Sequence, residues 1–410
     1  YAFPSLCCHI SLSLFAQRLG AGQREEANRV ACHGFLFYGL CWLLFLSFAL
    51  LGAPLFFRLS TDNAAVAAAG TSYLRICCGL SIGMCMQFLT ERLLQTTGHP
   101  AGFMIVQGSG AILNIVLDPV FIFGLDMGVV GAAAATVIGQ ISGACIGFFL
   151  LWRIRGQFSV SFRGFRPDRA LSAELLRIAA PAVVMQSLSS FMSLGLNQLL
   201  TLWSDTAVFV LGVYFKIQSF VFMPIFGVNS GLIPILSYNY GAKSAPRLSQ
   251  AVRFGAQLAL SAAVAGAVLL ALAAGPLLRY CFHAGGAAAA MGVPALRMAA
   301  LSFPIAAVSI ILSAAFQSLG HSGSSLLIAL LRQILLLLPI AALLLWLAPD
   351  SVWLSFLIAE AITCVATLLL YRRTVRPLIA ALADSDASHG TASDLPLVFG
   401  RIVHFIPYFL

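Results

Sequence analysis

Charged residues are scarce in this sequence. They make up 9% of its 410 residues, whereas hydrophobic residues make up 60% and the mean hydropathy is +0.96. A water-soluble domain carries about 25% charged residues, which cover its surface. The shortage excludes an ordinary soluble fold and indicates a protein whose outer surface faces lipid.

The chain also lacks the motifs that would mark an enzyme. It contains no nucleotide-binding glycine loop, no HExxH zinc motif and no evident Ser-His-Asp arrangement. Its ten cysteines lie mostly in apolar segments and show no zinc-ligand spacing with histidine. A membrane-embedded acyltransferase would need clustered His, Asp and Glu at a membrane face, and the sequence shows no such cluster. We therefore expect no enzymatic activity, no metal and no cofactor apart from a coupling ion.

Long apolar runs recur along the whole chain, and most reach the ~20 residues that cross a bilayer as a helix. The alternating pattern of a transmembrane barrel is absent. We therefore predict an all-α membrane protein with about eleven segments, the first of them incomplete. The predicted segments are 4–17, 33–56, 71–94, 102–123, 129–152, 175–200, 206–238, 251–274, 294–319, 324–347 and 351–372.

The net charge of +9 fits a topology signal better than nucleic-acid binding, because the basic residues lie mostly in short loops on alternate sides. The more basic set of loops includes the stretch 153–177 and the segment after Arg372, so we place that set and the C-terminus in the cytoplasm. The resulting division is an N-terminal lobe at 1–153, a cytoplasmic linker at 154–174, a C-terminal lobe at 175–373 and a disordered or atypical cytoplasmic tail at 374–410.

An internal repeat links the two lobes. The string QTTGH at 95–99 returns as QSLGH at 317–321, and Leu74-Arg75 returns as Leu296-Arg297, both at an offset of 222 residues. Six helices from 175 onward would return the chain to its starting side, which predicts parallel repeats with a binding site between them near the midplane. The first half shows only about four and a half helices, so the repeat predicts that one helix and most of another are missing.

Several strings resemble the multidrug and toxic compound extrusion (MATE) family, and its bacterial multidrug export branch in particular. They are LNIVLDPVFIF at 113–123 with GVVGAA at 128–133, LGAG at 19–22, and GVYFKIQSF at 212–220 with GLIP at 231–234. The resemblance covers 12–373. It implies two lobes of six helices that export amphipathic, often cationic, compounds in exchange for H⁺ or Na⁺.

Against this family, the sequence departs at both ends. The family's first-helix carboxylate, which is linked there to cation coupling, has no counterpart, and the residues after Ser385 look unlike the family. The resemblance thus implies a chain without the first helix and most of the second. We expect such a chain to transport poorly or not at all.

Three polar residues are candidates for coupling to a cation or proton. Asp118 lies in an apolar segment, where a carboxylate costs ~2.5–3.5 kcal/mol and should face a cavity or a partner. Asn114 lies one turn earlier on the same face. Glu360 lies in the last helix, as a proton carrier or as a partner of Arg332. For Asp118, a place at a helix end near the membrane surface is the alternative.

Six further residues are candidates for the substrate cavity. Gln186 and Asn197 are eleven residues apart and so share a helix face, and hydrogen bonds between helices are the alternative for such residues. Lys216 is expected to tune a proton site or to pair with Asp118, and extension to the membrane surface is the alternative. The six candidates are Gln186, Asn197, Tyr214, Lys216, Gln218 and Asn229.

Together these features predict a monomeric, multi-pass antiporter of the bacterial inner membrane. It would work by alternating access, with H⁺ or Na⁺ as the coupling ion, drugs or organic cations as substrates, and lipids but no nucleic acid as partners. Two alternatives stay open. One is a lipid-linked oligosaccharide flippase of the same superfamily, for which the sequence has few mid-helix cations, and the other is a non-functional transporter fragment.

Overall fold

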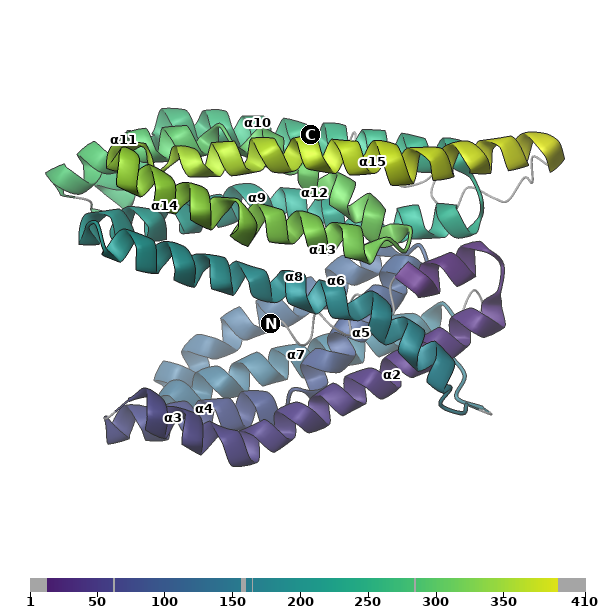
Figure 1. Ribbon diagram of the computed structural model, residues 1–410. Helices are drawn as coiled ribbons and strands as arrows, with labels where there is room; N and C mark the ends of the chain where they lie inside the picture. The colour runs from purple at the N-terminus through teal and green to yellow at the C-terminus, as the bar shows by residue number, and fades with distance from the viewer. Residues whose placement is uncertain (1–12, 62, 156–159, 164, 284, 390–410) are drawn as a thin grey trace. The chain divides into compact units, whose positions relative to one another are not determined.

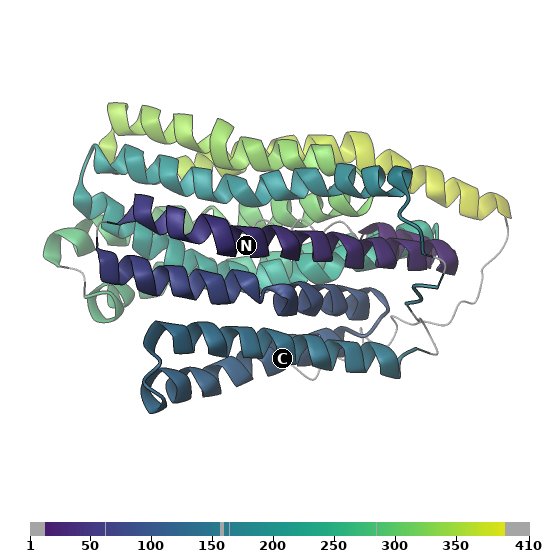
Figure 2. The same cartoon turned by 90° about the horizontal axis from the view of Figure 1, so that it is seen from below.

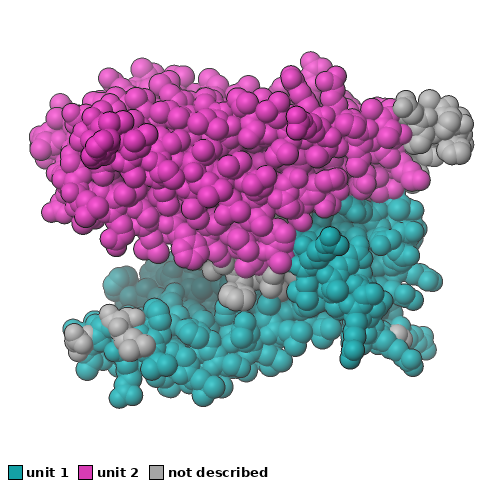
Figure 3. Space-filling model, in the orientation of Figure 1, with its two compact units in different colours: residues 1–179, 391–410 teal, residues 180–390 magenta. Residues whose placement is uncertain are grey.

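A computed structural model of the chain describes residues 13–61, 63–155, 160–163, 165–283 and 285–389. This part of the chain is helical almost throughout and contains no strand (Figure 1). It forms two compact units, one up to Ala179 and one from Ala180 onward, which are coloured separately in Figure 3. The division falls within a single long helix, five residues after the start predicted for the second lobe.

The first unit consists of helices joined by short connections. They are a helix at 13–20, α2 Arg24–Ser47, η1 Phe48–Gly52, α3 Ala53–Ser60, α4 Ala64–Gly79, α5 Ile82–Thr96, α6 Pro100–Pro119, η2 Val120–Gly124, α7 Gly128–Arg153 and the start of α8 Arg169–Thr201.

The second unit continues α8 and adds the remaining helices. They are α9 Asp205–Gly241, α10 Ala245–Pro276, η3 Leu277–Cys281, α11 Gly286–Ala300, α12 Phe303–Ser318, α13 Ser322–Leu330, η4 Leu331–Leu335, α14 Leu337–Leu347, η5 Pro349–Ser351 and α15 Leu354–His389.

The predicted all-α membrane fold is confirmed. Within the described residues, eight helices are long and apolar enough to cross a membrane, or up to ten if two bent pairs each form one span. These match the second to the eleventh predicted segment. Most of the first predicted segment, 4–17, lies outside the described residues.

Two segments predicted as continuous helices are bent instead, at equivalent points of the two halves. α4 meets α5 at 42°, and α11 meets α12 at 43°. At the first bend the Ser81 hydroxyl donates to the Cys78 carbonyl at 2.7 Å, which competes with the helical pattern. At the second bend Pro304 lies in the first turn of α12 and supplies no N–H for the preceding turn. Hydropathy alone does not register either effect.

The last helix is longer than predicted. α15 continues to His389, whereas the sequence analysis ended the helix at Arg372 and treated 374–410 as a disordered or atypical tail. The basic residues after Tyr371 lower the hydropathy, but Val375 is buried and Leu378 and Ile379 are half-buried, so apolar positions continue at helical spacing. Residues 390–410 lie outside the described part of the chain.

The repeated QxxGH strings end α5 and α12 in the same way. Gly98 and Gly320 have φ values of +84° and +83°, a left-handed conformation that glycine adopts without strain. In each case the following histidine N–H bonds back to the helix, from His99 to Leu94 O at 2.9 Å and from His321 to Phe316 O at 2.8 Å. These are Schellman-type ends. One lies in each unit at the same point of the repeat, which supports the internal repeat.

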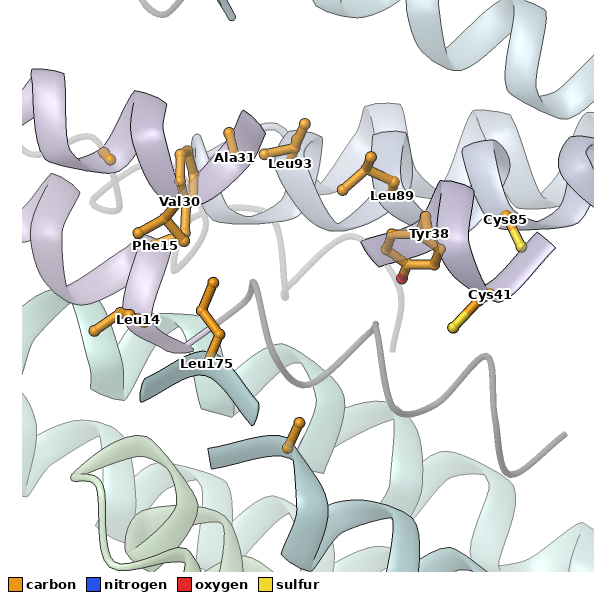
Figure 4. Close-up of a cluster of buried hydrophobic side chains, with 12 residues drawn as sticks. Leu14, Phe15, Val30, Ala31, Tyr38, Cys41, Cys85, Leu89, Leu93 and Leu175 are labelled. Carbon is orange, nitrogen blue, oxygen red and sulfur yellow. The ribbon is translucent and has the colours of Figure 1, made fainter. Parts of the chain in front are cut away.

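A buried cluster holds α2 against α5 in the first unit. Val30 and Tyr38 of α2 pack with Leu89 and Leu93 of α5, and Leu175 of α8 completes the cluster (Figure 4). α5, α6 and α7 pack against one another beside this core (Figure 2). α5, α6 and α7 carry the polar residues described below.

Glycines allow α6 and α7 to approach closely. A Cβ added at Gly139 would lie 2.7 Å from the Gly110 carbonyl oxygen, whereas one added at Gly108 of the same α6 would meet nothing within 4 Å. We expect Gly139→Ala to destabilise the protein by about 1–3 kcal/mol, because backbone atoms must move apart. Gly108→Ala should be neutral or stabilising by up to about 1 kcal/mol. Thermal unfolding in detergent measures both, and equal melting temperatures for the two variants would contradict this packing.

Candidate functional site

Asn114 and Asp118 lie together on α6, as their spacing predicted. The Asn114 amide Nδ2 donates to Asp118 Oδ1 at 3.3 Å and to the Thr136 hydroxyl of α7 at 3.5 Å. All three side chains are half-buried. The Thr136 hydroxyl donates to the Ala132 carbonyl at 2.9 Å, which fixes its orientation. The result is a carboxylate, an amide and a hydroxyl on two facing helices, with contacts long enough to be loose.

A second polar network lies in the same unit and was missed by the sequence analysis. Glu91 of α5 is 1% exposed, and its Oε1 accepts a hydrogen bond from Gln87 Nε2 at 2.9 Å. Gln87 Nε2 also reaches Gln107 Oε1 of α6 at 3.3 Å. The Gln87 side chain packs where Gly143 of α7 leaves room. Gln87 therefore contacts α6 and α7 and also bonds to the buried carboxylate of Glu91 on its own helix.

The two groups share one face of α6. Gln107, Asn114 and Asp118 are separated by seven and four residues, which are close to whole turns of an α-helix. The predicted coupling pair is therefore one end of a polar stripe along α6, and Gln107, which is exposed, lies between that pair and the Gln87–Glu91 pair of α5.

In the second unit Glu360 is paired with Arg332. Arg332 Nε of η4 lies 2.5 Å from Glu360 Oε1 of α15, and the two side chains are 20% and 11% exposed. Of the two roles that the sequence leaves open for Glu360, this geometry favours the ion pair. The other carboxylate oxygen, Oε2, is buried and has no hydrogen-bond partner among the described residues.

Tyr214 lies inside this unit instead of on an open surface. Its ring centroid is 4.7 Å from that of Phe356 and 6.4 Å from that of Phe303. Phe356 lies one turn before Glu360 on α15, so the Tyr214 ring lies beside the turn that carries the Glu360–Arg332 pair. The structure thus joins two residues that the sequence placed in separate groups of candidates.

Lys216 is exposed and lines an apolar pocket of ≈ 570 Å³ between α9 and η3. Gln218 is half-buried and does not line it. The lining residues are Lys216, Ile217, Ser219, Phe220, Val221, Leu277, Cys281 and Phe282.

The remaining cavity candidates are not brought together by any hydrogen bond. Gln186 is exposed on α8, and Asn197 donates to the Ser193 carbonyl of its own helix at 2.9 Å. Asn229 of α9 has a buried Oδ1 without a hydrogen-bond partner among the described residues. Their role in a substrate cavity stays a prediction.

The sequence model of the MatE family matches residues 11–120 and 181–343, so it covers both units. This chain belongs to the MatE family. The match confirms the resemblance drawn from the sequence strings and makes this MatE protein a multi-pass membrane protein.

Among curated relatives, this MatE protein is similar to the multidrug export protein MepA. It is 32% identical over 157 residues to MepA of Staphylococcus aureus (strain NCTC 8325 / PS 47), covering 38% of this chain and 34% of the relative. It is 25% identical over 287 residues to MepA of Staphylococcus saprophyticus, covering 69% and 62%. The matched part thus spans about a third to three fifths of these relatives.

Solved structures show the same fold. A crystal structure of MATE in complex with MaL6 has a TM-score of 0.85 and 23% identity, covering 93% of this chain and 86% of that chain. An outward-facing multidrug resistance MATE family transporter of the MOP superfamily has a TM-score of 0.83 and 22% identity, covering 93% and 85%. The all-α MATE architecture is therefore confirmed.

Proposed function

We propose that this MatE protein is a cation-coupled antiporter that exports amphipathic or cationic drugs by alternating access. Its curated relatives carry the name multidrug export protein. The observation that carries the proposal is the Asn114–Asp118–Thr136 group, which places a carboxylate inside an apolar helix that is long enough to cross a membrane. An ionisable residue within an apolar membrane-spanning helix is costly and typically marks an ion pathway or a proton relay.

The chemistry of this group suits a small hard cation or a proton. Asp118 supplies a negative charge, and the side chains of Asn114 and Thr136 supply neutral oxygens, which are the donors that hard cations prefer. The long contacts of 3.3 and 3.5 Å cost little to rearrange when an ion enters. Binding of H⁺ or Na⁺ neutralises Asp118, and this change of charge biases the unit toward one of two conformations.

The membrane potential supplies enough energy to concentrate a substrate outside the cell. One elementary charge crossing a potential of 100 mV supplies ~2.3 kcal/mol, which corresponds to a concentration ratio of roughly fiftyfold. Exchange of one ion for one uncharged amphipathic molecule moves one net charge and makes this energy available. For a cationic drug exchanged one for one the charges cancel, so the concentration gradient of the ion supplies the energy.

Glu360 suits coupling less well than Asp118. Arg332 already neutralises its charge at 2.5 Å, so a second cation at this carboxylate would be repelled by the guanidinium. We therefore assign ion coupling to Asp118 and Asn114, and a supporting role within the second unit to Glu360.

We further place the protein in the bacterial inner membrane as a monomer with a cytoplasmic C-terminus. The basic residues of the last helix, Arg372, Arg373 and Arg376, follow a long apolar stretch, and clusters of this kind favour the cytoplasmic side.

Efflux from living cells tests the function. Against the expectation of poor transport drawn from the incomplete repeat, a pump-deficient bacterium that expresses the gene for this chain should accumulate less ethidium than cells with an empty vector. A protonophore or removal of Na⁺ should abolish the difference. Accumulation that equals the vector control, with the protein shown to be in the membrane, would rule out drug export.

A further inference from the structure

The second unit contains a group of buried polar atoms that lack partners. The Tyr214 hydroxyl, Glu360 Oε2 and the Thr363 hydroxyl make no hydrogen bond of good geometry with any described residue, and Ser302 is the neighbour of the Tyr214 hydroxyl that comes nearest to making one. Counted over the whole residue, Tyr214 is 1% exposed, Thr363 0% and Glu360 8%. Buried polar atoms in native proteins are almost always hydrogen-bonded, and exceptions point to a bound water or ion.

These atoms belong to one neighbourhood. Phe356, Glu360 and Thr363 share a face of α15, because they are separated by four and three residues. The Tyr214 ring centroid lies 4.7 Å from that of Phe356, one turn before Glu360, and Glu360 is paired with Arg332. The side chains of this neighbourhood therefore come from three elements, with Tyr214 on α9, Arg332 on η4 and Glu360 on α15.

The charges decide which occupant fits. Arg332 compensates Glu360 at 2.5 Å, so the group is neutral as a whole. A metal cation would add a positive charge without a counter-charge, which is costly in an apolar interior. Water can donate to Glu360 Oε2 and to the Tyr214 hydroxyl oxygen without changing the charge.

We propose that the second unit encloses a hydration site in which ordered water joins Glu360 Oε2 to the Tyr214 hydroxyl. The water completes the hydrogen bonds of the carboxylate, and Glu360 therefore stays ionised and paired with Arg332. The claim that Glu360 stays ionised rests on the proposed function, in which the coupling ion binds at Asp118 in the first unit.

A double-mutant cycle tests the site. Tyr214→Phe keeps the ring contacts and removes only the hydroxyl. If water bonds this hydroxyl, the variant melts at a lower temperature than the native chain. In the Arg332→Met/Glu360→Met background, Tyr214→Phe should leave the melting temperature unchanged or raise it. A hydroxyl without any partner gives a rise in both backgrounds. A bond to the neighbouring Ser302 gives an equal loss in both. Either result overturns the proposal.

A direct structure provides a second measurement if the double variant does not fold. A map of the native protein in lipid nanodiscs, at a resolution that shows ordered water, should contain a density peak within hydrogen-bonding distance of Glu360 Oε2 and the Tyr214 hydroxyl. A dry apolar gap between them would overturn the proposal.

Infrared spectroscopy on acidification tests the ionised state of Glu360. The titratable groups that face Glu360 are Arg332, Tyr214 and Cys364. The carbonyl band of a protonated carboxyl group should remain in Glu360→Gln and weaken in Asp118→Asn. A band lost in Glu360→Gln contradicts an ionised Glu360. A band unchanged in Asp118→Asn counts against the proposed coupling site alone, so the two failures are distinguishable.

Discussion

Replacing Arg332 with leucine is expected to lower the free energy of unfolding by about 3–5 kcal/mol, because it leaves the Glu360 carboxylate buried without a counter-charge. The pair joins η4 to α15 at 2.5 Å, and both side chains are largely inaccessible. The result should appear as a large drop in melting temperature of the detergent-solubilised protein.

Two comparisons separate this effect from a general loss of an arginine. Arg279→Leu, at an exposed position of η3, should change stability by no more than about 0.5 kcal/mol. Arg332→Leu/Glu360→Leu removes both charges and should recover most of the stability. A double variant as unstable as Arg332→Leu alone would contradict this explanation, because the unpaired Glu360 carboxylate would then not be the cause of the lost stability.

Asp118→Asn should reduce ion-driven efflux by about ten- to a hundredfold while the protein still folds. The substitution keeps the shape of the side chain and removes its charge, and a charged hydrogen-bonding group contributes about 1.5–3 kcal/mol to the interactions that it makes. The measurement is the initial rate of ethidium efflux from energised cells at equal amounts of membrane protein.

The first unit offers matched controls for this substitution. Asp126→Asn also removes one carboxylate, at an exposed position whose φ of +51° asparagine tolerates, and its efflux should equal that of the native chain. Thr136→Ser should retain activity and Thr136→Val should lose part of it, because only serine keeps the hydroxyl near Asn114. Equal efflux for Asp118→Asn and Asp126→Asn would exclude Asp118 as the coupling residue.

The parts of the fold and site that the sequence predicts are those that depend on residues close together in the chain. Long apolar runs predicted the membrane helices, and the four-residue spacing of Asn114 and Asp118 predicted a contact that the structure contains. Thr136 was not predictable, because it lies 22 residues from Asn114 on another helix and only the packing of α6 against α7 brings it near. Hydropathy cannot specify that packing, which depends on Gly110 and Gly139.

Glu91 was missed although a signal was present. Gln87 and Glu91 are one turn apart within the predicted segment 71–94. Glu91 is an ionisable residue inside an apolar segment, which is the criterion that made Asp118 a candidate. The bend between α4 and α5 had no such signal, since Ser81 and its bond to Cys78 resemble many serines in straight helices. Side-chain competition for backbone groups is decided by tertiary packing.

The central claim is that Asp118 couples ion movement to drug export. It is tested most directly in proteoliposomes that contain the purified chain and a fluorescent indicator of H⁺ or Na⁺. Addition of an amphipathic cation should drive the coupling ion across the membrane for the native protein and for Asp126→Asn, and should not do so for Asp118→Asn. Ion movement of equal rate in all three, or transport of the drug without any ion movement, would contradict the claim.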